Sequence, residues 1–446
     1  MSTSKHPSLV KLDSAVSNIL FQELGISDAF ITALSEDGID SAFAIQELAI
    51  PLGLKGYDII GQAKTGTGKT LGFGLPLLER LLQSESSGVR ALVLTPTREL
   101  TVQVGNDLTR VSRLTKLRIV TVYGGAASQG QVNQLEKTPD VIVATPGRLL
   151  DFMNQGVISL SNLEVLVLDE ADEMLDMGFL PDVEKIIAKV PSTAQKMLFS
   201  ATMPGKIMSL ARGHMNNPTH IHASTPGEDE SIVDKIEQHV WRAHPLDKPE
   251  LIAKILQAET CTLSIIFCST KRGAAKLYDD LKARGFKAST IHGDLGQKQR
   301  EQALEALRNN KVQVLVATDV AARGLDIDGV THVINYDCPD DENTYVHRIG
   351  RTGRAGASGV AVTLVDWEDI PRWQHINRQL GLAFAEPIET YSNSEHVFTG
   401  LGINPNVPAR LQVQPVTQKT ETRTLKAKPQ STPRKRTRVN RSNPKQ

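Results

Sequence analysis

Short apolar runs alternate with longer amphipathic stretches over most of this chain. Each apolar run has the length of one strand, and the stretch 71–83 after the first of them has the length and period of a helix. Near-continuous apolar strands separated by amphipathic helices are typical of a parallel sheet with helices on both faces. In the first half of the chain the predicted strands are 59–61, 91–95, 119–123, 141–144, 165–168 and 197–199.

Small polar clusters follow nearly every one of these predicted strands. In an open α/β sheet, ligands bind beyond the carboxyl ends of the strands, so we expect the clusters to lie along one functional edge. The clusters are Pro96-Thr97-Arg98-Glu99-Leu100, Gly124-Gly125, Thr145-Pro146-Gly147-Arg148, Asp169-Glu170-Ala171-Asp172 and Ser200-Ala201-Thr202.

The alternation lapses between residues 218 and 234 and then resumes, which predicts a second α/β domain of the same architecture. Its predicted strands are 264–268, 288–291, 313–317, 332–335 and 360–365, with a helix such as 298–308 between them. Helical segments broken at Gly25 and Gly38 are expected over 21–48. The predicted organisation is an N-terminal lead (1–18), a first domain (19–221), a linker (222–233), a second domain (234–386) and a basic, largely disordered tail (387–446).

Composition supports a two-domain protein and excludes several other classes. The 446 residues are 40% hydrophobic and 22% charged, which allows two cores, and no apolar run is long enough to span a bilayer. The N-terminus lacks a signal-peptide core, and the three cysteines lack metal or redox spacing, so we expect a cytoplasmic protein. From Arg410 onward there are eleven Lys or Arg and one acid, so the zero net charge hides an acidic body and a basic tail.

The stretch Ala63-Lys64-Thr65-Gly66-Thr67-Gly68-Lys69-Thr70 lies between the first predicted strand and the helix after it. Its glycines leave backbone N–H groups free to surround phosphate oxygens, Lys69 adds a point charge, and a helix N-terminus favours anions. This spacing is that of a phosphate-binding loop, although Ala63 stands where the first glycine is usual. An ordinary glycine-rich turn is the alternative, and the flanking strand and helix argue against it.

Asp169 and Glu170 directly follow a predicted buried strand downstream of this loop. A nucleotide's Mg²⁺ prefers oxygen ligands, so Asp169 is the predicted magnesium holder together with Thr70. Glu170 is placed to orient or deprotonate an attacking water. A solvated acidic pair at a helix N-terminus would look similar in isolation, but the strand and the loop favour the catalytic interpretation.

The cluster His347-Arg348-Ile349-Gly350-Arg351-Thr352-Gly353-Arg354 lies in the second domain, which has no phosphate loop of its own. On a helix, His347, Arg351 and Arg354 would share one face. Isolated arginines are usually solvated surface. Beside a nucleotide held by the first domain, the two arginines become candidate arginine fingers, and hydrolysis would then require domain closure.

The order of these clusters resembles the DEAD-box family of ATP-dependent RNA helicases, literally so at Asp169-Glu170-Ala171-Asp172, and the similarity runs from about residue 21 to residue 380. The resemblance implies two tandem RecA-like (P-loop NTPase) domains with parallel sheets, ATP and Mg²⁺ in the cleft between them, and RNA lying across both. It also implies RNA-stimulated ATP hydrolysis with local separation of short RNA duplexes or remodelling of RNA–protein complexes.

The resemblance assigns roles to single residues. For the base and sugar of the nucleotide, Phe21 would stack on adenine, Gln46 would hydrogen-bond its edge, and Asp326 would touch the ribose. The phosphate loop would contribute Ala63, Thr65, Gly66, Thr67, Gly68, Lys69 and Thr70, and catalysis would rest on Lys69, Asp169, Glu170, Arg351 and Arg354. Coupling of the nucleotide to RNA would involve Asp172, Ser200, Thr202 and His347. The clusters that line the RNA backbone contain Pro96, Thr97, Arg98, Gly124, Gly125, Thr145, Arg148, Thr270, Gln297, Arg300, Thr318 and Arg323.

One segment departs from the family pattern. Ala42-Phe43-Ala44 stands where Pro-Thr-Pro or a close relative is usual, and Ile39 stands where an aromatic residue is usual. Loss of two prolines makes this turn less rigid, and the turn lies directly before Gln46, so the departure bears on adenine selectivity.

Two other functions are compatible with these residues: an ATP-gated RNA clamp without productive unwinding, and a DNA translocase, which the literal Asp169 to Asp172 cluster disfavours. A metabolic P-loop kinase is less consistent, because no acceptor pocket is suggested. The basic tail would tether structured RNA or ribonucleoprotein partners, with an inert extension or a compartment signal as the alternatives. We expect a monomer.

Overall fold

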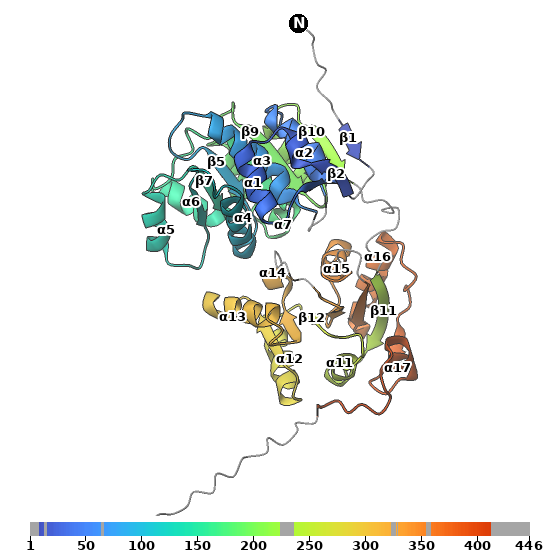
Figure 1. Cartoon of the computed structure of the whole chain (residues 1–446). Coiled ribbons are helices and arrows are strands. Elements are labelled where there is room, and N and C mark those ends of the chain that lie inside the picture. The colour runs from blue at the N-terminus through green and yellow to red at the C-terminus, as the bar shows by residue number, and fades with distance from the viewer. Residues whose placement is uncertain are drawn as a thin grey trace, which may run out of the picture. The chain divides into compact units, whose positions relative to one another are not determined.

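The fold is described from a computed structural model of the whole chain (Figure 1). The structure describes residues 9–12, 16–63, 67–223, 236–322, 327, 329–353 and 358–411, with the backbone alone for 9–12, 16–18, 297, 298 and 308. Two parallel sheets organise this part of the chain, and we call the surrounding structures lobe 1 (residues 9–223) and lobe 2 (residues 236–411). None of the described helices is both long enough and apolar enough to cross a membrane.

Lobe 1 contains an eight-stranded sheet of order β1-β10-β4-β9-β8-β5-β7-β6, in which every neighbouring pair is parallel. Its strands are β1 (Leu9–Leu12), β4 (Ile59–Gln62), β5 (Ala91–Leu94), β6 (Ile119–Val122), β7 (Val141–Ala144), β8 (Val165–Asp169), β9 (Gln195–Ser200) and β10 (Thr219–Ala223). A short antiparallel ribbon pairs β2 (Val16–Leu20) with β3 (Ser41–Phe43). The helices are η1 (Phe21–Leu24), α1 (Asp28–Glu36), α2 (Ala44–Leu54), α3 (Lys69–Gln83), α4 (Arg98–Val111), α5 (Ser128–Leu135), α6 (Pro146–Asn154), α7 (Ala171–Asp176), α8 (Leu180–Ile187) and α9 (Gly205–His214).

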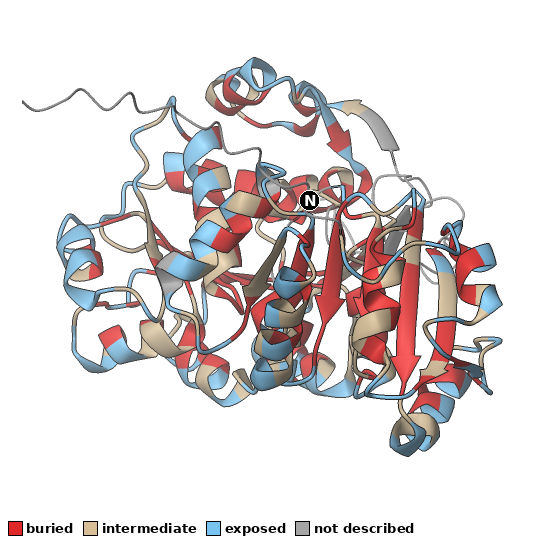
Figure 2. Cartoon of the chain, turned by 90° about the horizontal axis from the view of Figure 1, so that it is seen from below, coloured by how far each residue is buried: buried red, intermediate tan, exposed pale blue. Residues whose placement is uncertain are grey.

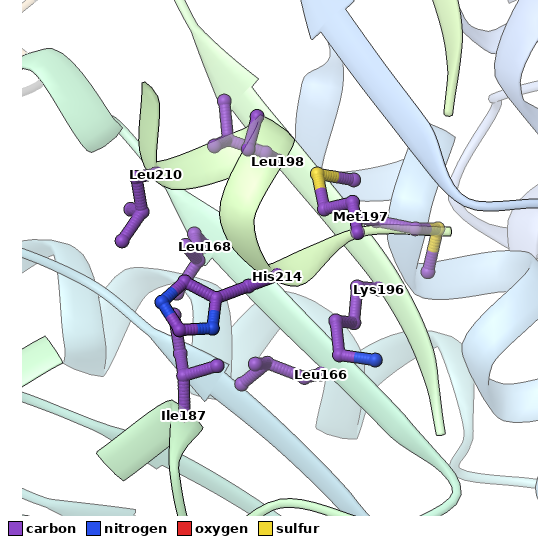
Figure 3. Close-up of a pocket in the computed structure, with 10 residues that line it drawn as sticks. Leu166, Leu168, Ile187, Lys196, Met197, Leu198, Leu210 and His214 are labelled. Atoms are coloured by element: carbon purple, nitrogen blue, oxygen red, sulfur yellow. The ribbon is translucent and has the colours of Figure 1, made fainter. Parts of the chain in front are cut away.

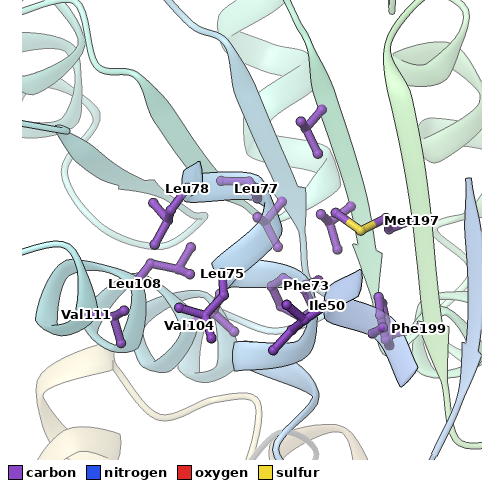
Figure 4. Close-up of a cluster of buried hydrophobic side chains, with 14 of the residues drawn as sticks. Ile50, Phe73, Leu75, Leu77, Leu78, Val104, Leu108, Val111, Met197 and Phe199 are labelled. Atoms are coloured by element: carbon purple, nitrogen blue, oxygen red, sulfur yellow. The ribbon is translucent and has the colours of Figure 1, made fainter. Parts of the chain in front are cut away.

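Helices cover both faces of this sheet because its central strands are apolar on both sides. Val93 and Val167 face a buried cluster with α1 to α4, whereas Leu92 and Leu166 face a second cluster with α5 to α9. Figure 4 shows the first cluster, in which side chains of α3 and α4 pack together with Met197 and Phe199 of β9. The buried strands between partly exposed helices are visible in Figure 2.

Lobe 2 contains a seven-stranded parallel sheet of order β13-β14-β12-β15-β16-β11-β17. Its strands are β11 (Ile236–Ala243), β12 (Ser264–Phe267), β13 (Ala288–Ile291), β14 (Val314–Ala317), β15 (His332–Asn335), β16 (Gly359–Val365) and β17 (Ile388–Thr390). The helices are α11 (Lys248–Ile255), α12 (Lys271–Ala283), α13 (Gln297–Arg308), α14 (Asp319–Ala322), α15 (Glu342–Ile349), η3 (Trp367–Asp369), α16 (Ile370–Gln379) and α17 (Glu395–Leu401). Apolar clusters with α11, α12 and α17 lie on one face, and clusters with α13 to α16 lie on the other.

The predicted fold class, two tandem α/β domains with parallel sheets, is confirmed. Each predicted strand is present with its ends shifted by at most two residues. The pattern did not identify β10, β11 and β17, nor the strands β1 and β2 that arise in the predicted N-terminal lead. The expectation of helical segments over 21–48 omitted β3, which interrupts them.

The predicted start of the tail at residue 387 is corrected by the structure. β17 pairs in parallel with β11, and α17 buries Val397, Phe398 and Leu401 in the core of lobe 2. These apolar residues are too few to produce a clear sequence period, but an existing sheet edge and core complete their burial. The described chain continues to Leu411, whose backbone N–H donates to the Arg284 carbonyl, and the predicted disorder of 412–446 lies outside the described residues.

Candidate nucleotide and RNA site

The phosphate loop joins the end of β4 to the start of α3. Ala63 is buried and its N–H donates to the Ser200 carbonyl at 3.1 Å, which fixes the loop entrance to the end of β9. Gly68 caps α3 with a φ of 79°, a left-handed conformation that glycine adopts without steric cost. Helix α3 therefore begins at Lys69 and directs its first N–H groups toward the loop. The predicted residues Thr65 and Gly66 lie outside the described residues, whereas Thr67 and Thr70 are half-buried.

Lys69 and Glu170 form a buried ion pair that links α3 to the end of β8. The Lys69 Nζ lies 2.8 Å from the Glu170 Oε1, and the two side chains are 6% and 8% exposed. Burial alone would lower the pKa of Lys69, but the carboxylates of Glu170 and Asp169 outweigh it and raise that pKa above its usual value. The structure thus brings together two predicted catalytic residues that are 101 positions apart.

Asp169 lies beside this pair and is 3% exposed. Its Oδ1 accepts the backbone N–H of Glu170 at 3.0 Å. Burial and the neighbouring Glu170 carboxylate raise the pKa of Asp169 to about 7, against the lowering effect of Lys69. The Asp169 carboxyl group is therefore a buried oxygen donor beside the Lys69–Glu170 pair.

The donor set fits Mg²⁺ on these observations. Asp169 offers a buried carboxylate and Thr70 a hydroxyl, and Mg²⁺ is commonly bound by one or two such oxygen ligands together with phosphates. Within the described ranges, no group of three or more His, Cys, Asp or Glu side chains is arranged to hold a metal by itself.

Glu170 itself has a strained backbone. Its φ is 53° and its ψ is 54°, a left-handed conformation that costs a side-chain-bearing residue on the order of 1–3 kcal/mol. This conformation ends β8 and begins α7 within one residue. Strain of this kind persists where the surrounding structure fixes a side chain for function.

Asp172 connects α7 to the end of β9. Its Oδ2 accepts hydrogen bonds from both the N–H and the Oγ1 of Thr202 at 2.8 Å, and its N–H donates to the Ser200 Oγ at 3.1 Å. Asp172 and Ser200 are buried. Three of the predicted coupling residues therefore form one network beside the Lys69–Glu170 pair.

The predicted base contacts are only partly brought to the loop. Gln46 is 1% exposed; its Oε1 accepts the Phe43 N–H at 2.8 Å and its Nε2 donates to the Gly68 carbonyl at 2.9 Å. Phe21 is 2% exposed and packs in the core of lobe 1, so its ring has no free face for adenine. The sequence around Phe21 did not indicate that this side chain would be buried. Asp326, the predicted ribose contact, lies outside the described residues.

The basic cluster of lobe 2 divides into the buried Arg348 and the half-buried residues His347 and Arg351. Arg348 is buried and pairs with Asp319 through two hydrogen bonds of 2.6 and 2.7 Å, an arrangement that the sequence did not reveal. His347 and Arg351 line a hollow with Asp319 and Arg348, and the buried His347 Nδ1 has no hydrogen-bond partner within the described ranges.

Arg351 also contacts the helix that follows the acidic pair. Its Nη2 lies 3.9 Å from the Glu173 Oε1 of α7, three residues beyond Glu170. Glu173 was not among the predicted site residues, although it adjoins the Asp169 to Asp172 cluster in the sequence. The second predicted finger, Arg354, lies outside the described residues.

The predicted RNA-contacting residues gather at helix N-termini beyond the strands. Thr97, Thr145 and Thr270 are the N-cap residues of α4, α6 and α12, where unpaired N–H groups favour phosphate. Pro96 and Thr97 are buried, and the Thr97 hydroxyl accepts the Leu100 N–H.

Arginines lie beside these helix ends. The Arg98 guanidinium lies 5.5 Å from the Tyr123 ring centroid and so close to Gly125 that a side chain there would collide with it. The Arg148 guanidinium stands over the Phe152 ring, and the Arg300 Nη2 lies 3.0 Å from the Glu99 Oε1. Gly124 and Thr318 are half-buried near their strand ends; the Gln297 side chain and Arg323 lie outside the described part.

A separate apolar hollow lies between α9 and the sheet of lobe 1. Figure 3 shows it lined by residues such as Leu166, Met197 and Leu210, with Lys196 and His214 nearby. It includes none of the predicted site residues, so it is separate from the predicted nucleotide and RNA site.

Comparison with known proteins agrees with this geometry. The DEAD/DEAH box helicase family model matches residues 43–210, and the helicase conserved C-terminal domain model matches residues 247–356. The chain is 45% identical over 358 residues to the DEAD-box ATP-dependent RNA helicase CshA of Geobacillus kaustophilus, covering 80% of this chain and 76% of the relative. It is 45% identical over 345 residues to the ATP-dependent RNA helicase CshA of Limosilactobacillus reuteri, covering 77% and 69%.

A solved structure shows the same architecture. Dbp5 of S. cerevisiae bound to RNA and ADP BeF3 is 31% identical and covers 84% of this chain and 96% of its own, with a TM-score of 0.73. The two parallel-sheet lobes are thus RecA-like domains, as predicted. With both family models matched and relatives aligned over most of its length, this chain belongs to the DEAD-box family of ATP-dependent RNA helicases.

Proposed function

We propose that this DEAD-box ATP-dependent RNA helicase hydrolyses ATP at the carboxyl edge of the lobe 1 sheet, with RNA as the activator. The observation that carries the proposal is the buried 2.8 Å pair of Lys69 and Glu170 at the N-terminus of α3. A buried lysine beside unpaired helix N–H groups suits phosphate, and a carboxylate in contact with it suits a water-orienting base. The triphosphate group of the nucleotide would therefore bind at the N-terminus of α3.

Arrival of the triphosphate would change the partners of this pair. The Lys69 ammonium has three donors, so it can turn toward the phosphate oxygens, and Glu170 then becomes available to hold the attacking water. Asp169 and Thr70 would hold Mg²⁺, which supplies charge neutralisation at the phosphates. The contact with Lys69 places the Glu170 carboxylate at the N-terminus of α3, beside the loop.

Coupling to RNA would pass through the Asp172 network. The carboxyl end of β9 and the acidic cluster share the hydrogen bonds of Asp172, Ser200 and Thr202. A shift at one end therefore changes the hydrogen bonds at the other. Guanidiniums of Arg351 and Arg354 would stabilise charge on the γ-phosphate, and RNA and ATP would each favour the arrangement that brings them there.

The decisive test measures phosphate release with and without single-stranded RNA, for the wild type and for Lys69→Ala. We expect strong stimulation by RNA in the wild type and loss of ATP turnover in the variant, since the lysine charge is removed from the phosphate site. Turnover that is equally fast without RNA, or that persists in Lys69→Ala, contradicts the proposal.

A duplex-release assay separates the helicase from an ATP-gated clamp. Release of short RNA strands with ATP, but not without it, supports unwinding, whereas RNA retention without release supports the clamp. Replacing RNA by DNA as the activator tests the translocase alternative. A monomeric state and a cytoplasmic location are further parts of the proposal, which sedimentation and cell fractionation test.

The basic tail is proposed to tether structured RNA or ribonucleoprotein partners. Its eleven Lys or Arg against one acid from Arg410 onward support binding through phosphates. Truncation after Leu411 keeps every residue that the structure describes in lobe 2, so it tests the tail. Weaker RNA binding with a flatter salt dependence is expected, and no change in either would dismiss the tether.

A further inference from the structure

Phe43 presents an exposed aromatic ring at the nucleotide end of lobe 1. Its side chain is 47% exposed, although large apolar side chains of this lobe are mostly buried. Along β3 the side chains alternate exposed, buried and exposed, so Ser41 and Phe43 face outward while Ala42 faces the core. Leu20, which pairs with Ser41 and is 43% exposed, adds a second exposed apolar side chain to the β2–β3 ribbon.

The ring lies directly against the phosphate loop. A Cβ built on Gly68 would stand 2.8 Å from the Phe43 Cδ2 and would collide with the Gln46 amide as well. Gly68 precedes Lys69, whose Nζ is half of the proposed catalytic pair. The exposed ring is therefore one glycine away from the residue that would meet the phosphates, on the side where α2 begins.

The other candidate base contacts are occupied or covered. The Gln46 amide already bonds the Phe43 N–H and the Gly68 carbonyl, and Gln46 is 1% exposed. Phe21 is 2% exposed, and Ile39 packs on the core of lobe 1. Phe43 thus offers what these residues lack, a free aromatic surface in contact with the loop.

We propose that Phe43 is the stacking platform for the purine ring of the nucleotide and determines base preference in this chain. The inference rests on the proposed function, since it deepens the same nucleotide site. A base laid on an exposed ring gains dispersion and removes apolar surface from water, and a purine offers a larger face than a pyrimidine. Gln46 then acts through its hold on Gly68 and on the Phe43 backbone as a positioning residue.

The test compares Phe43→Ala, Phe43→Leu and Phe43→Trp with the wild type. Each substitution keeps the backbone N–H that Gln46 accepts, and the exposure of the side chain makes folding of all three variants expected. Leu82→Ala is the matched control, because Leu82 is an apolar side chain that is 42% exposed but lies near the C-terminal end of α3, away from the phosphate loop. The probes are ATP, GTP, CTP and UTP in RNA-stimulated turnover, and a 2-aminopurine riboside triphosphate whose fluorescence falls on stacking.

We expect Phe43→Ala to raise the KM for ATP by roughly 5- to 150-fold, the range of base–aromatic stacking, with kcat at saturation within about twofold. The preference of Phe43→Ala for purine over pyrimidine triphosphates should fall by a similar factor. Phe43→Trp should have the KM for ATP and the purine preference of the wild type. Phe43→Leu should show no quench of the 2-aminopurine fluorescence. Leu82→Ala should match the wild type throughout.

Three results would overturn the assignment: an unchanged KM in Phe43→Ala, an unchanged base preference, or a full quench in Phe43→Leu. A wild type that binds none of the four triphosphates would instead contradict the proposed function. The two failures are therefore distinguishable.

Discussion

Replacement of Glu170 by glutamine removes the carboxylate charge while changing little else. The amide Oε1 of glutamine can still accept a hydrogen bond from Lys69 Nζ, which lies 2.8 Å from the Glu170 Oε1 in the native protein. A glutamine at this position has the same strained backbone with a φ of 53°, so the strain energy of the variant differs little from that of the wild type. The substitution therefore isolates the loss of a base beside the phosphate site.

The expected loss of rate follows from the role of a general base. Such a group contributes about 10²- to 10⁴-fold, which corresponds to about 3–5 kcal/mol in the activation barrier. We expect RNA-stimulated ATP turnover of Glu170→Gln to fall by that factor at saturating ATP and RNA. ATP affinity should change much less, because Lys69 and the helix N–H groups remain.

The assay is phosphate release at saturating RNA, combined with equilibrium titration of ATP. Glu164→Gln serves as the control, since Glu164 immediately precedes β8 at its opposite end and accepts a hydrogen bond of 2.5 Å from Ser84. More than a tenth of the wild-type rate in Glu170→Gln would refute the assigned role. A loss of ATP binding as large as the loss of rate would also refute it, because the residue would then serve binding.

Three further predictions concern lobe 2. Arg348→Ala leaves the half-buried Asp319 carboxylate without its two hydrogen bonds and should lower the free energy of unfolding by roughly 1–3 kcal/mol in urea titration, whereas an unchanged midpoint would show that the pair is dispensable. Burial lowers the pKa of His332 to about 4, whereas the pKa of a histidine in the unfolded chain is about 6.5. Between these two pH values only the unfolded chain binds a proton at this residue, so the free energy of unfolding should fall by roughly 3 kcal/mol as the pH drops from 6.5 to 4. His332→Asn should make the free energy of unfolding less dependent on pH in this range. Truncation after Pro387 should cost several kcal/mol because it removes buried residues of α17, at roughly 1.5–3 kcal/mol each, while truncation after Leu411 should leave the urea midpoint unchanged.

The architecture of the two lobes was predictable from local pattern. A continuous apolar run such as 141–144 predicts a buried parallel strand, and glycines between such a run and a helix predict a phosphate loop. The position of Asp169 and Glu170 after 165–168 likewise placed them at the carboxyl end of a strand. These inferences need only residues that are close together along the chain.

Tertiary structure decided which of the candidate side chains meet and which are free. The Lys69–Glu170 pair joins residues 101 positions apart, and the exposures of Phe21 and Phe43, 2% and 47%, could not be ranked from either aromatic's neighbours. The segment after residue 387 was assigned to the tail because its few apolar residues have no period. In the structure β17 pairs with the edge of the lobe 2 sheet, and α17 packs on the core of that lobe. The sequence by itself determined strands, helices and loop chemistry, because these depend on local spacing; pairing, burial and the free ring at the loop depend on surfaces that only the folded chain brings together.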